Sequence, residues 1–315
     1  MNQATYPSIL CLGEPMIEFV RSGDPDSDIY LAGVGGDTSN AAVAAARQGA
    51  HVGYLTALGA DRFAERIRGL WASEGIDAST VLCNPVAPTG LYIIDPDPIE
   101  RHFIYYRSGS AASRYSEDQL PVDHLSHAAV LHVSGITLAV SDTLRRSAFS
   151  AMRQIRAAGG RVSLDTNLRL KLWDAGTAQR ITHEAAKEAS VLITSIEDSQ
   201  TLTGLTEPTA ILSHYAVLGC QIVIVTRGEK GAVVQVEGET RAIDPVIANA
   251  VDSTGAGDSF AGSFLAWWLE TGDPWTAARL ASIVAAGTVS ALGAVDPIPR
   301  REEVLQRAAS IGLEV

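Results

Sequence analysis

The sequence predicts an α/β fold, in which a mainly parallel central sheet is covered by helices on both faces and a small β-sheet lid projects from it. Short apolar runs alternate with helical segments along most of the chain, an order typical of parallel strands joined by helices. One pair of β-branched and aromatic runs, residues 89–95 and 101–107, has no helix between its members and predicts a hairpin. The 315 residues are 46% hydrophobic and contain no repeat or linker, so we expect a single domain over residues 1–315.

The expected elements follow from the period of the apolar residues. Strands are expected over residues 9–12, 16–20, 52–58, 89–95, 101–107, 130–133, 162–165, 191–194, 222–226, 232–236 and 240–243. Helices are expected over residues 40–47, 61–73, 142–158, 177–189, 207–218, 256–269 and 275–292. The glycine-rich segment 33–39 is expected to be a turn. The lid would comprise about residues 15–33 and 89–108.

Charge and composition exclude several classes of protein. The formal net charge is −12 and the sequence contains no long cluster of Lys and Arg, which disfavours a nucleic-acid partner. The uncharged, largely apolar stretch at residues 280–295 is shorter than a bilayer span. The N-terminus lacks the basic and apolar regions of a signal peptide, and the three cysteines are scattered. We therefore expect a soluble, cytoplasmic protein with neither a membrane nor a nucleic-acid partner.

The segment 252–264, DSTGAGDSFAGSF, carries the clearest chemical signal. Gly255, Ala256 and Gly257 stand where a loop enters a helix, and small residues there let backbone N–H groups approach an anion. Asp258 follows in the first helical turn, where a carboxylate can accept the proton of a hydroxyl that attacks a phosphoryl group. The alternative is a tight turn followed by an ordinary carboxylate at a helix N-terminus.

Other motifs fit less well. Phe260 stands where a dinucleotide-binding fingerprint needs its third glycine, and the chain has no GK pair for a phosphate-binding loop. Ser259 could be imagined as a hydrolase nucleophile, but no histidine follows it in the sequence. His124 and His127 have a zinc-like spacing without an accompanying carboxylate motif, so two loop histidines are the simpler interpretation.

The segment 252–264 resembles the C-terminal signature of the PfkB family, the ribokinase-like carbohydrate kinases. Residues 35–49, GGDTSNAAVAAARQG, resemble the other signature of that family, including Gly35, Gly36, Asn40 and Ala42. The resemblance covers nearly the whole chain. It implies a ribokinase-like three-layer α/β/α sandwich with a β-sheet lid, which phosphorylates a sugar hydroxyl from MgATP. It also implies that Asp258 is the catalytic base and that Gly255, Ala256 and Gly257 form the anion hole.

Several segments are most similar to family members that phosphorylate a keto sugar acid, among them GEPMIEF from Gly13 and SLDTNLRLKLW from Ser163. The resemblance implies substrate contacts from Gly35, Gly36, Asn40, Tyr92, Tyr106, Arg107 and Arg169. A guanidinium group can donate two parallel hydrogen bonds to one carboxylate, which suits Arg107 and Arg169 to the binding of a sugar acid. Strand alternation places Tyr105 and Tyr106 on opposite faces, and we expect Tyr106 to face the sugar.

The resemblance also implies a nucleotide site. The expected contacts with ATP are Ser195, Thr226, Gly228, Lys230, Gly231, Gly255, Gly257 and Ser282. The family's N-x-x-E motif, which is associated with magnesium and phosphate, is here Ser195-Ile-Glu197-Asp198. Asp198 is therefore expected to act indirectly on Mg²⁺, which needs only one or two carboxylates besides phosphate and water.

Two other functions stay open at this point. One is a kinase of the same family that acts on a neutral sugar such as fructose or ribose. The other is a non-catalytic regulator that binds sugar or nucleotide, although an intact Asp258 argues against it. An exposed edge of the lid sheet would also permit a homo-oligomer formed through the lid.

Overall fold

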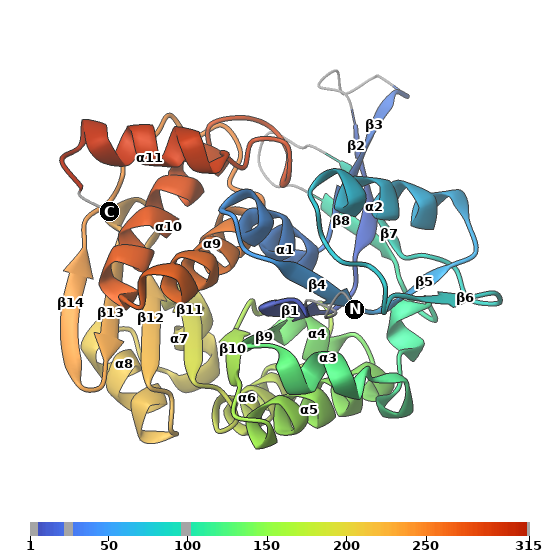
Figure 1. Cartoon of the computed structure of the whole chain (residues 1–315), viewed down its shortest axis with the longest axis horizontal. Coiled ribbons are helices and arrows are strands. Elements are labelled where there is room, and N and C mark those ends of the chain that lie inside the picture. The colour runs from blue at the N-terminus through green and yellow to red at the C-terminus, as the bar shows by residue number, and fades with distance from the viewer. Residues whose placement is uncertain (1–5, 22–27, 96–101, 314–315) are drawn as a thin grey trace, which may run out of the picture.

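A computed structural model describes residues 6–21, 28–95 and 102–313 of the chain. Its centre is an eight-stranded sheet with the order β14-β13-β12-β11-β10-β9-β1-β4, in which only β13 runs in the direction opposite to the other strands (Figure 1). The strands are β1 (Ile9–Leu12), β4 (Val52–Leu55), β9 (Val130–Ser134), β10 (Arg161–Asp165), β11 (Val191–Ser195), β12 (Ile222–Thr226), β13 (Ala232–Val236) and β14 (Glu239–Ile243).

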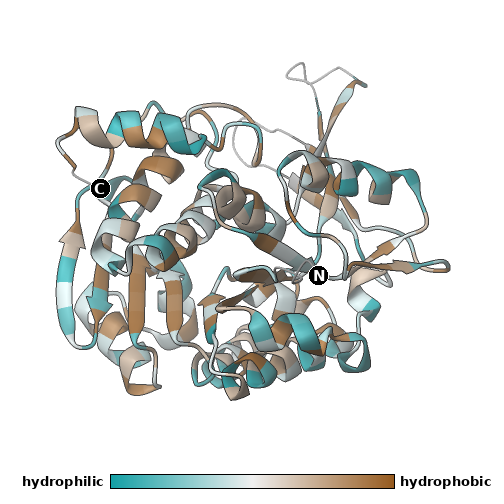
Figure 2. Cartoon of the chain, viewed as in Figure 1, coloured by the Kyte–Doolittle hydropathy of each residue, from teal (hydrophilic) through white to brown (hydrophobic). Residues whose placement is uncertain are grey.

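Helices cover both faces of this sheet, because its strands are apolar on both sides. In β1, Ile9 and Cys11 pack into one core cluster, whereas Leu10 and Leu12 pack into the other, as the period of two requires. Figure 2 shows the central strands as predominantly hydrophobic. One face is covered by α1 (Asp37–Arg47), α2 (Arg62–Ser73), α9 (Ala256–Thr271), α10 (Pro274–Thr288) and α11 (Arg301–Ser310). The other is covered by α3 (Val122–His127), α4 (Gly135–Ala139), α5 (Asp142–Ala157), α6 (Ala175–Ala186), α7 (Ile196–Thr203) and α8 (Pro208–Val217).

A second sheet of four strands, here called the small sheet, projects from the eight-stranded sheet (Figure 1). Its order is β3-β2-β7-β8, with β2 and β7 parallel and both outer pairs antiparallel. Its strands are β2 (Met16–Arg21), β3 (Tyr30–Gly35), β7 (Leu91–Asp95) and β8 (His102–Tyr106). The predicted hairpin is therefore confirmed as the antiparallel pair β7–β8. A separate short pair, β5 (Ala57–Gly59) with β6 (Leu82–Asn84), lies beside it.

The structure corrects three expected boundaries. The run 52–58 is not one strand, because it divides after Leu55 into β4, in the eight-stranded sheet, and β5, which pairs elsewhere. The segment 33–39 is not simply a turn, since β3 continues to Gly35 and α1 begins at Asp37. Helix α10 ends at Thr288 rather than near Leu292. An apolar pattern in the sequence does not indicate where a strand exchanges one hydrogen-bonding partner for another, or the residue at which a helix ends.

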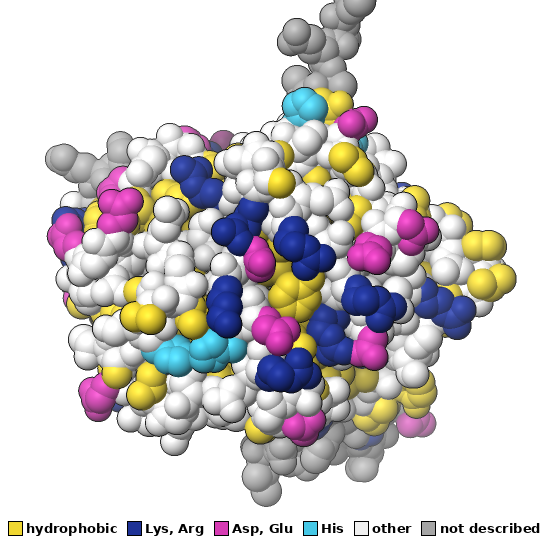
Figure 3. Space-filling model, turned by 90° about the horizontal axis from the view of Figure 1, so that it is seen from below, with side chains coloured by type: hydrophobic (Ala, Val, Ile, Leu, Met, Phe, Trp, Pro, Cys, Tyr) yellow, Lys and Arg dark blue, Asp and Glu magenta, His cyan; other side chains and the backbone are white. Residues whose placement is uncertain are grey.

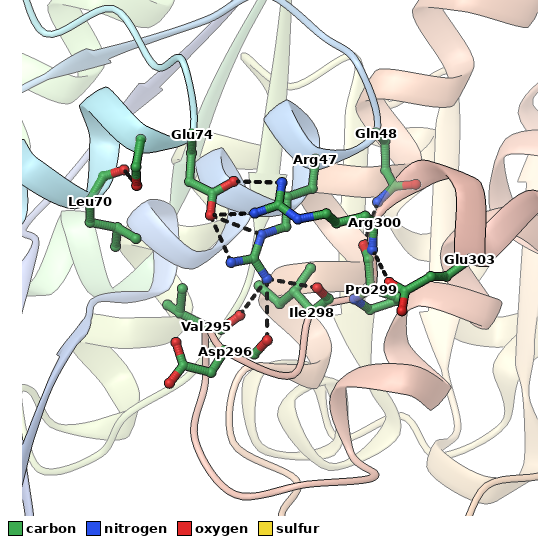
Figure 4. Close-up of polar contacts among 11 residues, drawn as sticks. Arg47, Gln48, Leu70, Glu74, Val295, Asp296, Ile298, Pro299, Arg300 and Glu303 are labelled. Carbon is green, nitrogen blue, oxygen red and sulfur yellow. Dashed lines mark hydrogen bonds and ion pairs between the residues drawn. The ribbon is translucent and has the colours of Figure 1, made fainter.

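Arg47, in the last turn of α1, fixes the segment that precedes α11 (Figure 4). Its Nη1 donates to the carbonyl oxygens of Val295 and Ile298 at 2.8 and 2.7 Å, and its Nη2 lies 2.8 Å from Glu74 Oε1. Both side chains of the Arg47–Glu74 pair are largely buried. The same segment contacts the start of α9, because a Cβ on Gly255 would lie 2.7 Å from the carbonyl oxygen of Ala294. The Arg47 cluster thus joins α1 and Glu74, which follows α2, to the segment that precedes α11.

Basic and acidic side chains are interspersed on the face seen in Figure 3, on the side of the molecule where α5 and α6 lie. Ion pairs join Arg145 to Asp142 on α5 and Arg156 to Glu188 beyond α6. The signs are mixed, so this face does not form one uniform cationic surface. Among the described residues, no helix is both long enough and apolar enough to span a bilayer.

Candidate active site

A cavity of about 780 Å³ lies where the two sheets meet. One wall is formed by the carboxyl ends of β10, β11 and β12, through Asp165, Ser195 and Thr226. The opposite wall includes Met16, Tyr92, Phe103 and Tyr105 of the small sheet. Parallel α/β sheets bind ligands at this end of their strands because loops and helix N-termini converge there.

Asp258 lies in the first turn of α9 and lines this cavity. Gly255 precedes the helix with φ 77°, a left-handed conformation that glycine adopts without strain. Asn40 Nδ2 donates to Asp258 Oδ2 at 2.8 Å, and Asn167 Nδ2 donates to Oδ1 at 3.1 Å. Loss of solvent, followed by the negative charge of Asp37, raises the pKa of Asp258 to about 7. A carboxyl with that pKa can both accept and release a proton near neutral pH.

The two amides reach Asp258 because their elements are held close to α9. A Cβ on Gly262 would lie 1.9 Å from the carbonyl oxygen of Ala41, so α9 and α1 cross at their backbones and bring Asn40 to the carboxylate. Asn167 follows β10 and has φ 32°, a left-handed conformation that asparagine tolerates better than most residues. This conformation occurs at the site where the side chain meets Asp258, which agrees with the tendency of backbone strain to collect at functional sites.

Three further carboxylates line the cavity, namely Asp37, Asp165 and Asp198. Burial raises the pKa of Asp37, although the Ser134 hydroxyl donates a hydrogen bond to it. Burial also raises the pKa of Asp165 well above its usual range, with Asp258 and Asp198 adding like charge. Asp198 Oδ2 accepts hydrogen bonds from Thr166 Oγ1 at 2.8 Å and from the Leu168 amide at 2.9 Å.

The small sheet contributes aromatic rings to the opposite wall. The rings of Tyr92, Phe103 and Tyr105 lie within 5.9–6.2 Å of one another, centroid to centroid. Tyr92 donates a hydrogen bond to Glu18 Oε2 at 2.6 Å. Burial, followed by the negative charge of Glu18, raises the pKa of Tyr92 well above its usual range. Gly35 leaves room for this ring, since a Cβ there would lie 2.2 Å from the Tyr92 hydroxyl.

The structure reverses the expectation for the two adjacent tyrosines of β8. Tyr105 lines the cavity, whereas Tyr106 is 62% exposed and does not. Alternation along the strand explains this, because Phe103, Tyr105 and Arg107 share one parity and all three line the cavity. The guanidinium of Arg107 also lies 5.7 Å from the centroid of the Tyr105 ring.

Both predicted arginines line the cavity, but their environments differ. Arg107 is 8% exposed, and its Nε donates to Glu14 Oε2 at 2.7 Å. Arg169 is exposed, and its Nη1 donates to the carbonyl oxygen of Leu168 at 2.8 Å. The positive charge of Arg169 opposes the rise in the pKa of Asp258, which places its influence on the same site.

The residues predicted to contact a nucleotide divide into two groups. Ser195, Thr226, Gly255 and Gly257 line the cavity, and Ser195 also caps α7 by accepting a hydrogen bond from the Asp198 amide. The other predicted nucleotide contacts, Gly228, Lys230, Gly231 and Ser282, lie outside its lining. Outside it too are Gly35, which was predicted to contact the substrate, and Ala256, which was predicted in the anion hole. A smaller cavity of about 230 Å³ lies between residues 246–248 and one side of α10 and α11.

The described residues contain no group of three or more His, Cys, Asp and Glu side chains arranged to hold a metal ion. His124 and His127 instead contact the ring of Tyr6. The donor chemistry at Asp165 and Asp198 nevertheless fits Mg²⁺, which takes oxygen ligands and completes its shell with water and phosphate.

A half-buried carboxylate at a glycine-rich helix N-terminus faces a cavity that two guanidinium groups also line, an arrangement suited to the transfer of an anionic group to a hydroxyl. Residues 7–301 match the model of the pfkB family of carbohydrate kinases, and the chain belongs to that family. The chain is 34% identical to the 2-dehydro-3-deoxygluconokinase of Thermoproteus tenax, over 96% of this chain and 94% of that protein. It is 31% identical to the probable fructokinase-4 of Arabidopsis thaliana, over 94% and 95%.

The architecture agrees with solved structures. The crystal structure of fructokinase with bound ATP from Xylella fastidiosa superposes with a TM-score of 0.89 at 25% identity, covering 96% of this chain and 98% of that chain. The fold is therefore the predicted ribokinase-like sandwich. Sequence reasoning missed Glu14, Asp37, Asp165 and Asn167. The available signal was the carboxyl end of the predicted strand 162–165, where Asp165 is the last residue and Asn167 follows.

Proposed function

We propose that this chain transfers the γ-phosphoryl group of ATP to the terminal hydroxyl of 2-keto-3-deoxygluconate, giving the 6-phosphate and ADP. The observation that carries the proposal is the position of Asp258, which faces the cavity between Asn40 and Asn167 at the N-terminus of α9. The similarity to 2-dehydro-3-deoxygluconokinases supports the choice of substrate.

In this reaction Asp258 accepts the proton of the 6-hydroxyl, and the oxygen forms a bond to the γ-phosphorus. The bond between that phosphorus and the bridging oxygen breaks, and ADP leaves with the electron pair. Backbone N–H groups of residues 255–257, at the positive end of α9, stabilise the negative charge on the transferred phosphoryl group. Asn40 and Asn167 hold the carboxylate in the orientation that the hydroxyl requires.

The carboxylate of the sugar acid is recognised by cations on both sides of the cavity. Arg107 approaches from the small sheet and Arg169 from the loop after β10. Asp37 accepts hydrogen bonds from the hydroxyl groups, Tyr92 contacts the carbon chain, and Tyr105 contacts the sugar acid through its hydroxyl. A neutral sugar would bring no anionic partner for Arg169 or for the donors of Arg107 that Glu14 does not engage, which is unfavourable for a largely buried group such as Arg107.

The nucleotide occupies the side of the cavity formed by Ser195, Thr226 and Gly257. Its purine ring extends toward the smaller cavity beside α10, near Ser282, with Gly228, Lys230 and Gly231 along the ribose and phosphates. Asp165 and Asp198 would hold Mg²⁺ through its water ligands. The ion would neutralise charge on the phosphates when bound.

The small sheet acts as a lid that closes over the sugar and excludes water. Its other face carries apolar side chains, with Ile104 46% and Tyr106 62% exposed. We assign this face to contact between two copies of the chain. Sedimentation equilibrium of the wild type and of Ile104→Glu distinguishes a dimer through this sheet from a monomer.

The substrate is tested by measuring ADP release with MgATP and a panel of sugars: 2-keto-3-deoxygluconate, its galacto epimer, fructose, ribose and no sugar. We expect turnover with the sugar acids only. Preference for fructose or ribose would contradict the acid site while keeping Asp258 as the base. Absence of turnover across the panel would instead favour a non-catalytic regulator.

A further inference from the structure

The four chain connections between the small sheet and the rest of the molecule converge on one residue, Glu14. Glu14 itself lies in the first connection, between β1 and β2. Gly36 follows β3, and a Cβ on it would lie 2.6 Å from the Glu14 carbonyl oxygen. Gly90 precedes β7, and a Cβ on it would lie 2.7 Å from Glu14 Oε1. Arg107, which pairs with Glu14, follows β8.

The Glu14 side chain is buried and fully engaged. Its residue exposure is 1%, and its two carboxylate oxygens have different partners. Oε2 accepts from Arg107 Nε at 2.7 Å, and Oε1 accepts from the Ser110 hydroxyl. A carboxylate buried to this degree is stable only when it is paired and hydrogen-bonded, so the position of Glu14 and that of Arg107 depend on each other.

Glu14 accepts a hydrogen bond only from Nε of the Arg107 guanidinium. Nη2 also forms an ion pair with Glu14 Oε2 at 2.6 Å, but neither it nor Nη1 donates a hydrogen bond among the described residues, so the edge that these two nitrogens form keeps unused donors. Because Arg107 lines the cavity, this donor edge can bind an anionic ligand group. An unsatisfied buried donor is costly, and a substrate carboxylate removes that cost.

We infer that Glu14 is a positioning residue for sugar-acid recognition: it holds the guanidinium of Arg107 in the orientation that binds the substrate carboxylate. Glu14 neutralises the buried guanidinium and fixes its Nε, which leaves a single donor edge directed at the ligand. This inference rests on the proposed function. Glu14 contacts no reacting atom, and its effect reaches the substrate only through Arg107.

A double-mutant cycle tests this dependence, because a residue that acts only through another has no further effect once that other is changed. The variants are Glu14→Gln, Arg107→Gln and the double variant, all measured for KM and kcat with 2-keto-3-deoxygluconate and for KM with ATP. We expect Glu14→Gln to raise KM for the sugar acid by about tenfold, in the range seen when a binding group is misplaced, with KM for ATP unchanged. In the Arg107→Gln background, Glu14→Gln should change KM less than about twofold.

Glu74→Gln is the matched control. Glu74 also pairs with an arginine, Arg47, and the two side chains are only 5% and 8% exposed, but the pair lies outside the cavity. Loss of a buried charge should lower the melting temperature of both Glu→Gln variants, whereas only Glu14→Gln should raise KM for the sugar acid. Equal KM effects in the two variants would overturn the inference.

Failure of the inference can be told from failure of the proposed function. If the wild type phosphorylates neutral sugars and not sugar acids, the proposed function fails before any variant is made. If the wild type uses the sugar acid but the effects of Glu14→Gln and Arg107→Gln on KM multiply, Glu14 acts independently of Arg107 and the inference is wrong. If Glu14→Gln does not fold, Ser110→Ala replaces it, because the Ser110 hydroxyl donates to the other carboxylate oxygen of Glu14. Ser110→Ala should give a smaller rise in KM for the sugar acid, and only when Arg107 is present. A rise that persists in the Arg107→Gln background overturns the inference.

Discussion

The two sheets that enclose the cavity contribute different kinds of side chain. The eight-stranded sheet and its helices supply carboxylates and amides, including Asp165, Asn167 and Asp258, at strand ends and a helix N-terminus, with one cation, Arg169, in the loop after β10. The small sheet and the residue that follows it supply rings and a cation, Tyr105 and Arg107.

This difference indicates a division of roles between the sheets. Proton transfer requires fixed geometry, and Asp258 is fixed by hydrogen bonds from residues on two other elements. Recognition of a particular sugar requires a surface that fits its shape and charge, which the small sheet can provide without changing the chemistry. Relatives with different substrate names, such as the fructokinase and the 2-dehydro-3-deoxygluconokinase, are consistent with such a division.

The largest effect is expected on the side of the eight-stranded sheet. Asp258→Asn removes the proton acceptor, and kcat should fall by about 10³-fold or more. Binding of the sugar acid and of ATP, measured by calorimetry, should persist because asparagine keeps the size of the side chain. A variant that retains most of its turnover would assign the base to another residue.

A smaller effect is expected for the cation that the same sheet contributes. Arg169→Ala should lower kcat/KM for the sugar acid by about 10- to 100-fold, the usual range for one charge-assisted contact. The change should lie in KM for the sugar, with KM for ATP unaffected. An equal loss with every sugar in the panel would show that Arg169 does not read the carboxylate.

Asp258→Asn should stabilise the folded protein at alkaline pH, although the same change lowers its activity. The pKa of Asp258 is raised to about 7 in the folded protein, so the folded state binds a proton more tightly and loses stability as pH rises from about 4 through 7. Asp258→Asn has no proton to lose, and should exceed the wild type by about 2 kcal/mol at pH 8, a value reduced because the carboxyl faces the cavity. Urea unfolding at pH 8 and pH 4.5 measures this; a difference that does not shrink at the lower pH contradicts it.

The smallest effect distinguishes the two faces of the small sheet. Tyr105→Phe should raise KM for the sugar acid by about threefold, since a hydroxyl contact contributes roughly 0.5–1.5 kcal/mol. Tyr106→Phe changes a side chain on the other face and should leave KM unchanged. The reverse result would place Tyr106 in the site after all.

The sequence specified the eight-stranded sheet well, because fully buried parallel strands are recognisable as continuous apolar runs between helices. The run 222–226, for example, coincides with β12. The assignments of Asp258 and of residues 255–257 depended on a short local motif, in which base and anion site are neighbours in sequence. Local chemistry of this kind is readable without tertiary structure.

Contacts between distant residues were harder to predict. Asn167 and Asp258 are 91 positions apart, and Glu14 and Arg107 are 93 apart; neither pair has a local signal. The choice between Tyr105 and Tyr106 was wrong although the information was present, since Arg107 was already expected to face the ligand and shares its parity with Tyr105. The face of a strand follows from its whole pattern, not from one residue.

The most direct test of the central claim is the dependence of kcat/KM for the sugar acid on pH, at saturating MgATP. The substrate carboxylate stays ionised over the range 5.5–9, so the profile reports ionisation of the enzyme–MgATP complex that binds the sugar. With Asp258 as base, kcat/KM should be level above pH of about 7 and fall about tenfold per unit below it. A profile that stays level down to pH 5.5 would contradict the assignment of Asp258 as a base with a raised pKa.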